Sequence, residues 1–158
     1  MTKLILVRHC EAEGNTKGVL QGRTDSNVSG NSAAQLDLIG LRLRNEPIAA
    51  LYSSPLRRAY KTAEAINRYH DLPIRIDGRL TEIDVGAWEG CTWEEIQRED
   101  GPLVRVWNES PGEFQARDGE SMRDVYDRMW EAALEIVRAH PGQTVCAVSH
   151  GCAIRSFL

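Results

Sequence analysis

Two short apolar runs, each followed by a histidine, constrain the fold of this chain most strongly. Residues 4–7 are aliphatic and lead through Arg8 to His9, and residues 145–148 are small or aliphatic and lead to His150. Short β-rich runs separated by helical stretches predict a parallel sheet. Ligands of such sheets bind beyond the carboxyl ends of the strands. We therefore expect His9 and His150 to share one pocket.

Helical periodicity connects the predicted strands. Residues 32–44, 56–69 and 121–138 place apolar side chains three and four residues apart, which predicts helices that pack on the sheet. Residues 101–119 are polar and rich in turn formers, so we expect a loop there, anchored by Trp107 and Phe114, within a lid of about residues 78–119. The pattern predicts one α/β domain over residues 1–158, a three-layer α/β/α sandwich with a mostly parallel central sheet.

A further basic residue follows another strand-like run at residues 51–52. Ser54 can cap a helix and Pro55 is favourable at a first helical position, which places Arg57 in the first helical turn. Helix N-termini present free N–H groups and attract anions, and a guanidinium there strengthens such a site. Together with the residues at the two strand ends, Arg57 predicts a phosphate-binding site.

Six segments in this order resemble the histidine phosphatase superfamily, whose best-known branch is the cofactor-dependent phosphoglycerate mutases. They lie at residues 8–15, 20–26, 52–59, 82–90, 119–121 and 149–151, and the resemblance spans residues 3–158. The segment around Trp88 is similar to that of the small phosphatases, including α-ribazole-phosphate and broad-specificity phosphatases. The resemblance thus implies a phosphomonoester hydrolase, with mutase-type phosphoryl transfer as the alternative.

The resemblance also implies the chemistry. His9 would be the nucleophile and would form a phosphohistidine, while its other ring nitrogen donates to a fixed acceptor, expected to be a backbone carbonyl. Glu82 would protonate the leaving alkoxide and then take a proton from the attacking water. Asp84 and Glu89 compete for this role, and only the register of the motif favours Glu82.

The remaining expected residues hold the phosphoryl group. Removing one such donor from a transition state costs on the order of 3 kcal/mol. No metal or other cofactor is expected, because the cationic cluster neutralises the transferring group. The expected catalytic residues are His9, Glu82, His150, Arg8 and Arg57, and the expected substrate-binding residues are Arg8, Asn15, Gln21, Gly22, Arg57, His150 and Gly151.

Composition limits the partners. With 19 basic and 23 acidic residues the net charge is −4, which argues against general nucleic-acid binding. No apolar stretch approaches the roughly 20 residues of a membrane span, and no signal peptide precedes the first motif, so we expect no membrane partner and a cytoplasmic location. The four cysteines lack metal-binding spacing, which favours reduced thiols. The expected partner is a small phosphorylated metabolite.

Only residues 151–158 follow the second histidine, whereas the proteins that the chain resembles continue with a full helix and at least one strand. We therefore expect C-terminal elements of the fold to be missing and exposed apolar residues to drive self-association, for example as a homodimer. A catalytically weak phosphate-binding or regulatory protein is a further alternative. The presence of His9, Arg57 and Glu82 favours an enzyme.

Overall fold

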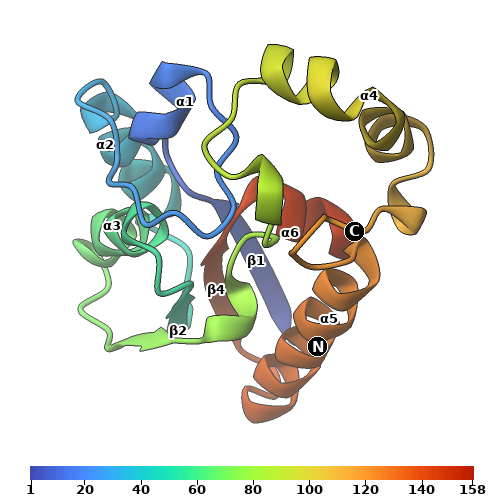
Figure 1. The fold of residues 1–158 in the computed structure, drawn as a ribbon. Helices are drawn as coiled ribbons and strands as arrows, with labels where there is room; N and C mark the ends of the chain where they lie inside the picture. Colours follow the sequence, from blue (N-terminus) through green and yellow to red (C-terminus); the bar gives the residue numbers. More distant parts are fainter.

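A four-stranded sheet forms the centre of the molecule (Figure 1), which a computed structural model describes over residues 1–158. The strands are β1 (Lys3–Arg8), β2 (Ile48–Ser53), β3 (Ile74–Ile76) and β4 (Thr144–Ser149), in the order β1-β4-β2-β3. All three pairings are parallel, so the prediction of a mostly parallel sheet is confirmed.

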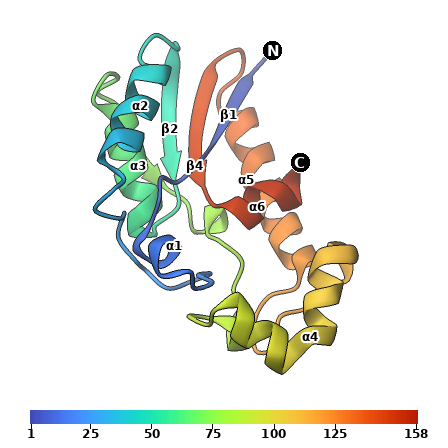
Figure 2. The ribbon, with the colours of Figure 1, turned by 90° about the horizontal axis from the view of Figure 1, so that it is seen from above.

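Helices cover both faces of this sheet (Figure 2). On one face lie α2 (Ala33–Leu43) and α3 (Arg57–Asn67), and on the other lie α5 (Met122–Ala139) and α6 (Gly151–Phe157). The three-layer sandwich is therefore confirmed. Two further helices are α1 (Glu13–Lys17) and α4 (Trp93–Glu109), and single 3₁₀ turns span Gly78–Leu80, Gly86–Trp88 and Pro111–Glu113. None of the helices is long and apolar enough to cross a membrane.

Strand β4 separates two apolar cores. Its Val148 packs with Leu51 and Ile66 under α3, whereas its Ala147 packs with Met129 of α5 on the opposite face. Burying one aliphatic side chain of this size contributes about 1.5–3 kcal/mol. The alternation along β4 thus packs a helical layer against each face of the sheet.

Helix α5 begins as its sequence predicts. The Ser121 Oγ accepts a hydrogen bond from the Asp124 N–H at 3.0 Å, and the Asp124 carboxylate accepts one from the Ser121 N–H at 3.0 Å. This reciprocal pair satisfies two N–H groups that a helix start otherwise leaves free. Ser121 and Asp124 therefore form a capping box at the start of α5.

The predicted loop over residues 101–119 is wrong in its first half, because α4 continues to Glu109. Asp100 interrupts the helix with φ −141° and ψ 36°, and Pro102 follows in the first turn of the next helical segment, where proline is tolerated. The Asp100 carboxylate accepts a hydrogen bond from the Trp88 indole at 3.0 Å. The anchoring role of Phe114 is confirmed, since it is 1% exposed and its ring centroid lies 4.8 Å from that of Trp107.

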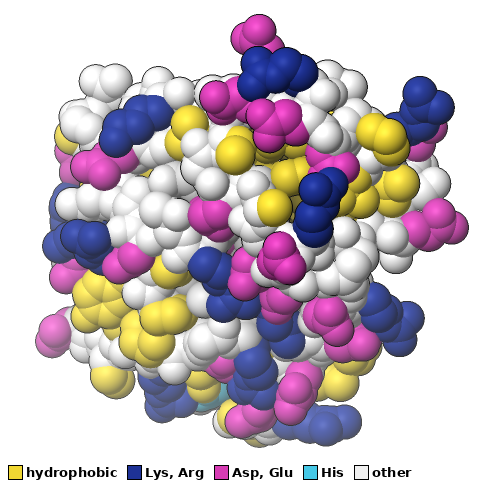
Figure 3. Space-filling model, in the orientation of Figure 1, with side chains coloured by type: hydrophobic (Ala, Val, Ile, Leu, Met, Phe, Trp, Pro, Cys, Tyr) yellow, Lys and Arg dark blue, Asp and Glu magenta, His cyan; other side chains and the backbone are white.

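Charged side chains of both signs are interspersed over the face shown in Figure 3. Hydrophobic side chains gather there in the hollow that separates α4 from the rest of the molecule. The surface therefore presents no uniform basic region on this face, and its apolar hollow lies beside the carboxyl end of the sheet.

Candidate active site

The two histidines lie side by side because their strands are neighbours. Arg8 of β1 pairs with Ser149 of β4, so His9 and His150 each follow directly on adjacent strand ends. The His9 N–H donates to the Ser149 carbonyl at 3.0 Å, and the two imidazole centroids are 5.1 Å apart. The carboxyl end of the sheet brings together residues 141 positions apart in sequence, from 9 to 150.

One ring nitrogen of His9 is hydrogen-bonded to the backbone, and the other has no hydrogen-bond partner in the chain. Its Nδ1 lies 2.6 Å from the Cys10 carbonyl oxygen, which can only accept, so Nδ1 carries the proton and Nε2 keeps its lone pair. The expected backbone acceptor is confirmed. Burial lowers the pKa of His9 to about 4, with the charges of Arg58 and Arg8 contributing in the same direction and the Cys10 hydrogen bond opposing. The imidazole is therefore neutral at pH 7.

His150 is fully buried, and its two ring nitrogens also differ. Nε2 lies 2.8 Å from the Ser54 Oγ, while Nδ1 has no hydrogen-bond partner. Burial lowers the pKa of His150 well below its usual value, and the positive charge of Arg58 adds to the effect. Ser54 was expected to cap a helix, but α3 begins at Arg57 after Leu56. The Ser54 hydroxyl accepts a hydrogen bond from the Leu56 N–H at 3.3 Å and also contacts His150.

The structure places Arg58, rather than the expected Arg57, between the histidines and the loop that covers them. The Arg57 side chain is 61% exposed and pairs with the Asp25 carboxylate at 3.1 Å, outside the cavity beside His9. Arg58 is 1% exposed, and its guanidinium donates to the carbonyls of Thr24 at 2.6 Å and Gly22 at 2.8 Å. Successive helical residues point about 100° apart, so the residue at which α3 begins decides which arginine faces inward.

Helix α1 contributes Asn15 to the cavity, and the loop after α1 contributes Gln21. Gly22, also expected there, does not line it. Its carbonyl holds Arg58, and its N–H donates to the Glu89 carboxylate at 3.0 Å. A Cβ at Gly22 would lie 2.2 Å from the Ile83 carbonyl oxygen, so only glycine fits. Gly22 therefore acts through Arg58.

Glu82 is buried at the start of α6. Its carboxylate accepts hydrogen bonds from the N–H groups of Ile83 at 2.9 Å, Cys152 at 3.0 Å and Ala153 at 2.9 Å. It lines the same cavity as His9. The Arg128 guanidinium donates to the Glu82 carbonyl at 3.0 Å and fixes the backbone that carries this carboxylate. The motif register had favoured Glu82, and the structure places it beside the histidines.

The two competing carboxylates have other partners. Asp84 accepts a hydrogen bond from the Gly86 N–H at 3.0 Å, and Glu89 accepts from the N–H groups of Gly22, Arg23 and Thr24. Neither lines the cavity. Glu89 instead closes the loop whose carbonyls hold Arg58.

The cavity that these residues enclose, here called the central cavity, has a volume of about 670 Å³. Of the expected residues, Arg8, His9, Asn15, Gln21, Glu82 and Gly151 line it, whereas His150 does not. Among the residues that line it without an expected site role are Arg58, Trp93 and Arg155. Trp107, expected only as a lid anchor, also lines it. Arg155 could have been found from its spacing, because it lies four residues after Gly151 on the same helix face. No group of three or more His, Cys, Asp or Glu side chains is arranged to hold a metal ion.

Known proteins are similar to this chain in sequence and in fold. The family model of the histidine phosphatase superfamily (branch 1) matches residues 4–158. Phosphoserine phosphatase 1 of Hydrogenobacter thermophilus is 38% identical over 157 residues, which are 99% of this chain and 74% of that protein.

Two solved structures superpose closely on the fold. Bacillus stearothermophilus YhfR has a TM-score of 0.93 at 35% identity, with 99% of this chain and 77% of that chain covered. The phosphoserine phosphatase of Entamoeba histolytica, solved with 3-phosphoglyceric acid, has a TM-score of 0.86 at 31% identity and the same coverage. The chain therefore belongs to the histidine phosphatase superfamily, and its phosphatase relatives support a phosphoric monoester hydrolase.

Proposed function

We propose that the chain hydrolyses phosphomonoesters of small metabolites through a phosphohistidine on His9, without a metal ion. The observation that carries this proposal is the His9 ring, whose Nδ1 contacts a backbone carbonyl at 2.6 Å and whose Nε2 remains a neutral nucleophile in the central cavity. An imidazole with a free lone pair attacks phosphorus directly and divides the displacement into two steps. The phosphatase names of the similar proteins support the same reaction class.

Each step has its proton carrier. In the first, Nε2 bonds to phosphorus, the ester P–O bond breaks, and Glu82 gives its proton to the leaving alkoxide. In the second, the Glu82 carboxylate takes a proton from water, the water oxygen bonds to phosphorus, and the P–N bond breaks to release inorganic phosphate. Glu82 is suited to both steps because it lines the same cavity as His9 and its position is fixed by three N–H donors.

Cationic and polar groups hold the phosphoryl oxygens. Arg8 and Arg58 line the central cavity and provide the charge that a metal ion supplies in many other phosphatases. The buried Nδ1 of His150 has no partner within the chain, and it is the ring atom we assign to a phosphoryl oxygen. Donors arranged before the reaction cost no reorganisation when charge develops.

Trapping the intermediate tests the proposal. The protein, treated with EDTA, is mixed with p-nitrophenyl phosphate and quenched in alkali, and the labelled peptide is identified by mass spectrometry. We expect the phosphoryl group on His9 and a loss of turnover in His9→Ala, while the control His70→Ala, altered outside the cavity, stays active. Phosphate on His150, or full activity of His9→Ala, would contradict the mechanism. Interconversion of phosphoglycerates without net hydrolysis would support the mutase alternative.

Self-association stays a prediction. Trp130 of α5 is 45% exposed and contacts Phe157 of α6, with ring centroids 5.4 Å apart. Exposed aromatic side chains of this kind favour contacts between copies. Light scattering over a range of concentrations checks it, and a monomer throughout would contradict it.

A further inference from the structure

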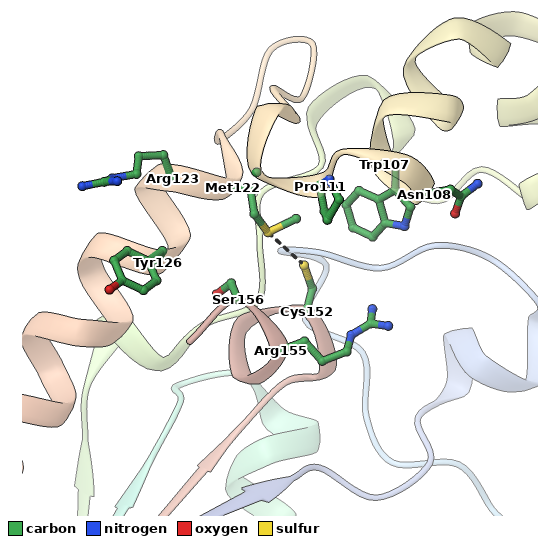
Figure 4. Close-up of a pocket in the computed structure, with 10 residues that line it drawn as sticks. Trp107, Asn108, Pro111, Met122, Arg123, Tyr126, Cys152, Arg155 and Ser156 are labelled. Atoms are coloured by element: carbon green, nitrogen blue, oxygen red, sulfur yellow. Dashed lines mark hydrogen bonds between the residues drawn. The ribbon is translucent and has the colours of Figure 1, made fainter. Parts of the chain in front are cut away.

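A second cavity adjoins the central cavity and shares a wall with it. This side cavity has a volume of about 600 Å³ and lies between α4, the start of α5 and α6 (Figure 4). Trp107, Cys152 and Arg155 line both cavities. A substrate whose phosphoryl group lies beside His9 therefore has room to extend its leaving group past these three residues.

The side cavity is cationic and has no acidic residue in its lining. Two arginines line it, and their charges are not equally available. Arg123 pairs with Asp127 at 3.1 Å and lies 5.5 Å from the centroid of the Tyr126 ring. Arg155 is exposed and forms neither an ion pair nor a side-chain hydrogen bond. Its charge is the one that a ligand can use.

Aromatic side chains fix the shape of the space around Arg155. The Trp107 ring centroid lies 6.1 Å from that of Trp93 and 4.8 Å from that of the buried Phe114, so Trp107 is held in place. In Figure 4 the Arg155 side chain extends from α6 below Trp107 and Asn108. Arg155 therefore lies where the two cavities meet, in a lining that it shares with Trp107.

We propose that Arg155 binds a carboxylate on the leaving group and makes the enzyme selective for carboxylate-bearing phosphomonoesters. This inference rests on the proposed function. A planar guanidinium matches a carboxylate through two parallel hydrogen bonds. The charges also fit: Arg8, Arg58 and His9 line the central cavity, where the phosphoryl dianion would lie, whereas the unpaired Arg155 guanidinium matches a single negative charge.

Matched substrates test this role. Phosphoserine carries a carboxylate that phosphoethanolamine lacks, and the two are otherwise the same. In the second pair, 3-phosphoglycerate carries a carboxylate where glycerol 3-phosphate carries a hydroxymethyl group. We expect Arg155→Gln to lower kcat/KM for the carboxylate member of each pair at least about tenfold, as loss of a charge-assisted hydrogen bond does. The other member should change by less than about twofold, because it makes no such bond. Arg155→Lys keeps the charge without the planar fork and should restore part of the preference.

Two controls distinguish failure of the proposed role of Arg155 from failure of the proposed function. Arg123→Gln alters the other arginine of the side cavity and should leave the preference unchanged. Hydrolysis of p-nitrophenyl phosphate, which carries no carboxylate, reports the proposed function alone. If the wild-type protein hydrolyses it but shows equal or no activity on both members of each pair, the role of Arg155 is overturned while the phosphatase mechanism stands. An equal loss in Arg155→Gln on both members also overturns it, and inactivity on every substrate contradicts the proposed function itself.

Discussion

Two neighbouring arginines allow a direct test of the site, because only one of them lies in the central cavity. Arg58→Gln removes a guanidinium that is 1% exposed and donates to the carbonyls of Gly22 and Thr24. Arg57→Gln removes one whose side chain is 61% exposed and pairs with Asp25. The two substitutions are chemically identical and adjacent, so a difference between them reports position alone.

The structure sets the expected losses in stability and in kcat/KM. Leaving the buried Gly22 carbonyl without its donor costs about 1–3 kcal/mol of stability. Loss of the guanidinium from the transition state should lower kcat/KM by about 100- to 1000-fold. For Arg57→Gln, loss of an exposed ion pair costs less than about 1 kcal/mol, and kcat/KM should stay within about threefold of wild type.

The assay measures kcat/KM with p-nitrophenyl phosphate and the free energy of unfolding in urea for each variant. Arg58→Lys keeps a positive charge with a smaller effect on packing, and it separates loss of fold from loss of chemistry, because it should remain folded with activity between wild type and Arg58→Gln. If Arg57→Gln loses as much activity as Arg58→Gln while both stay folded, the assignment of Arg58 to the phosphoryl group is refuted.

Three further outcomes follow from the same site. Glu82→Gln should slow hydrolysis of phosphoserine far more than that of p-nitrophenyl phosphate, whose leaving group needs little protonation; equal losses in steady-state assays would assign Glu82 a structural role. EDTA should leave kcat unchanged, and a requirement for added Mg²⁺ would contradict the charge-neutralising role of the arginines. Burial lowers the pKa of His9 to about 4 from the usual 6.5. Between about pH 4 and pH 6.5 the unfolded chain therefore binds a proton on His9 that the folded protein does not bind. Urea titrations should therefore show stability falling as pH drops from about 6.5 toward 4, less steeply in His9→Asn, and the same slope in both proteins would be evidence against a neutral His9.

The sequence alone determined how the histidines converge. The apolar runs before His9 and His150 form parallel strands, and carboxyl ends of parallel strands lie on one edge of a sheet. The capping interaction of Ser121 with Asp124 could be predicted as well, because both partners lie within one turn and depend on local geometry only. Such features need nothing from distant parts of the chain.

The tertiary structure alone decided which polar side chains serve the site. Ser54 contacts His150, 96 residues away, and α3 begins at Arg57 after Leu56, so Arg58 points inward while Arg57 faces solvent. Glu82 was favoured over its neighbours by motif register, but the N–H of Cys152 in α6 that donates to its carboxylate lies 70 residues farther along the chain. A shift of one residue turns a helical side chain by about 100°, and its direction depends on partners that only the folded chain brings near.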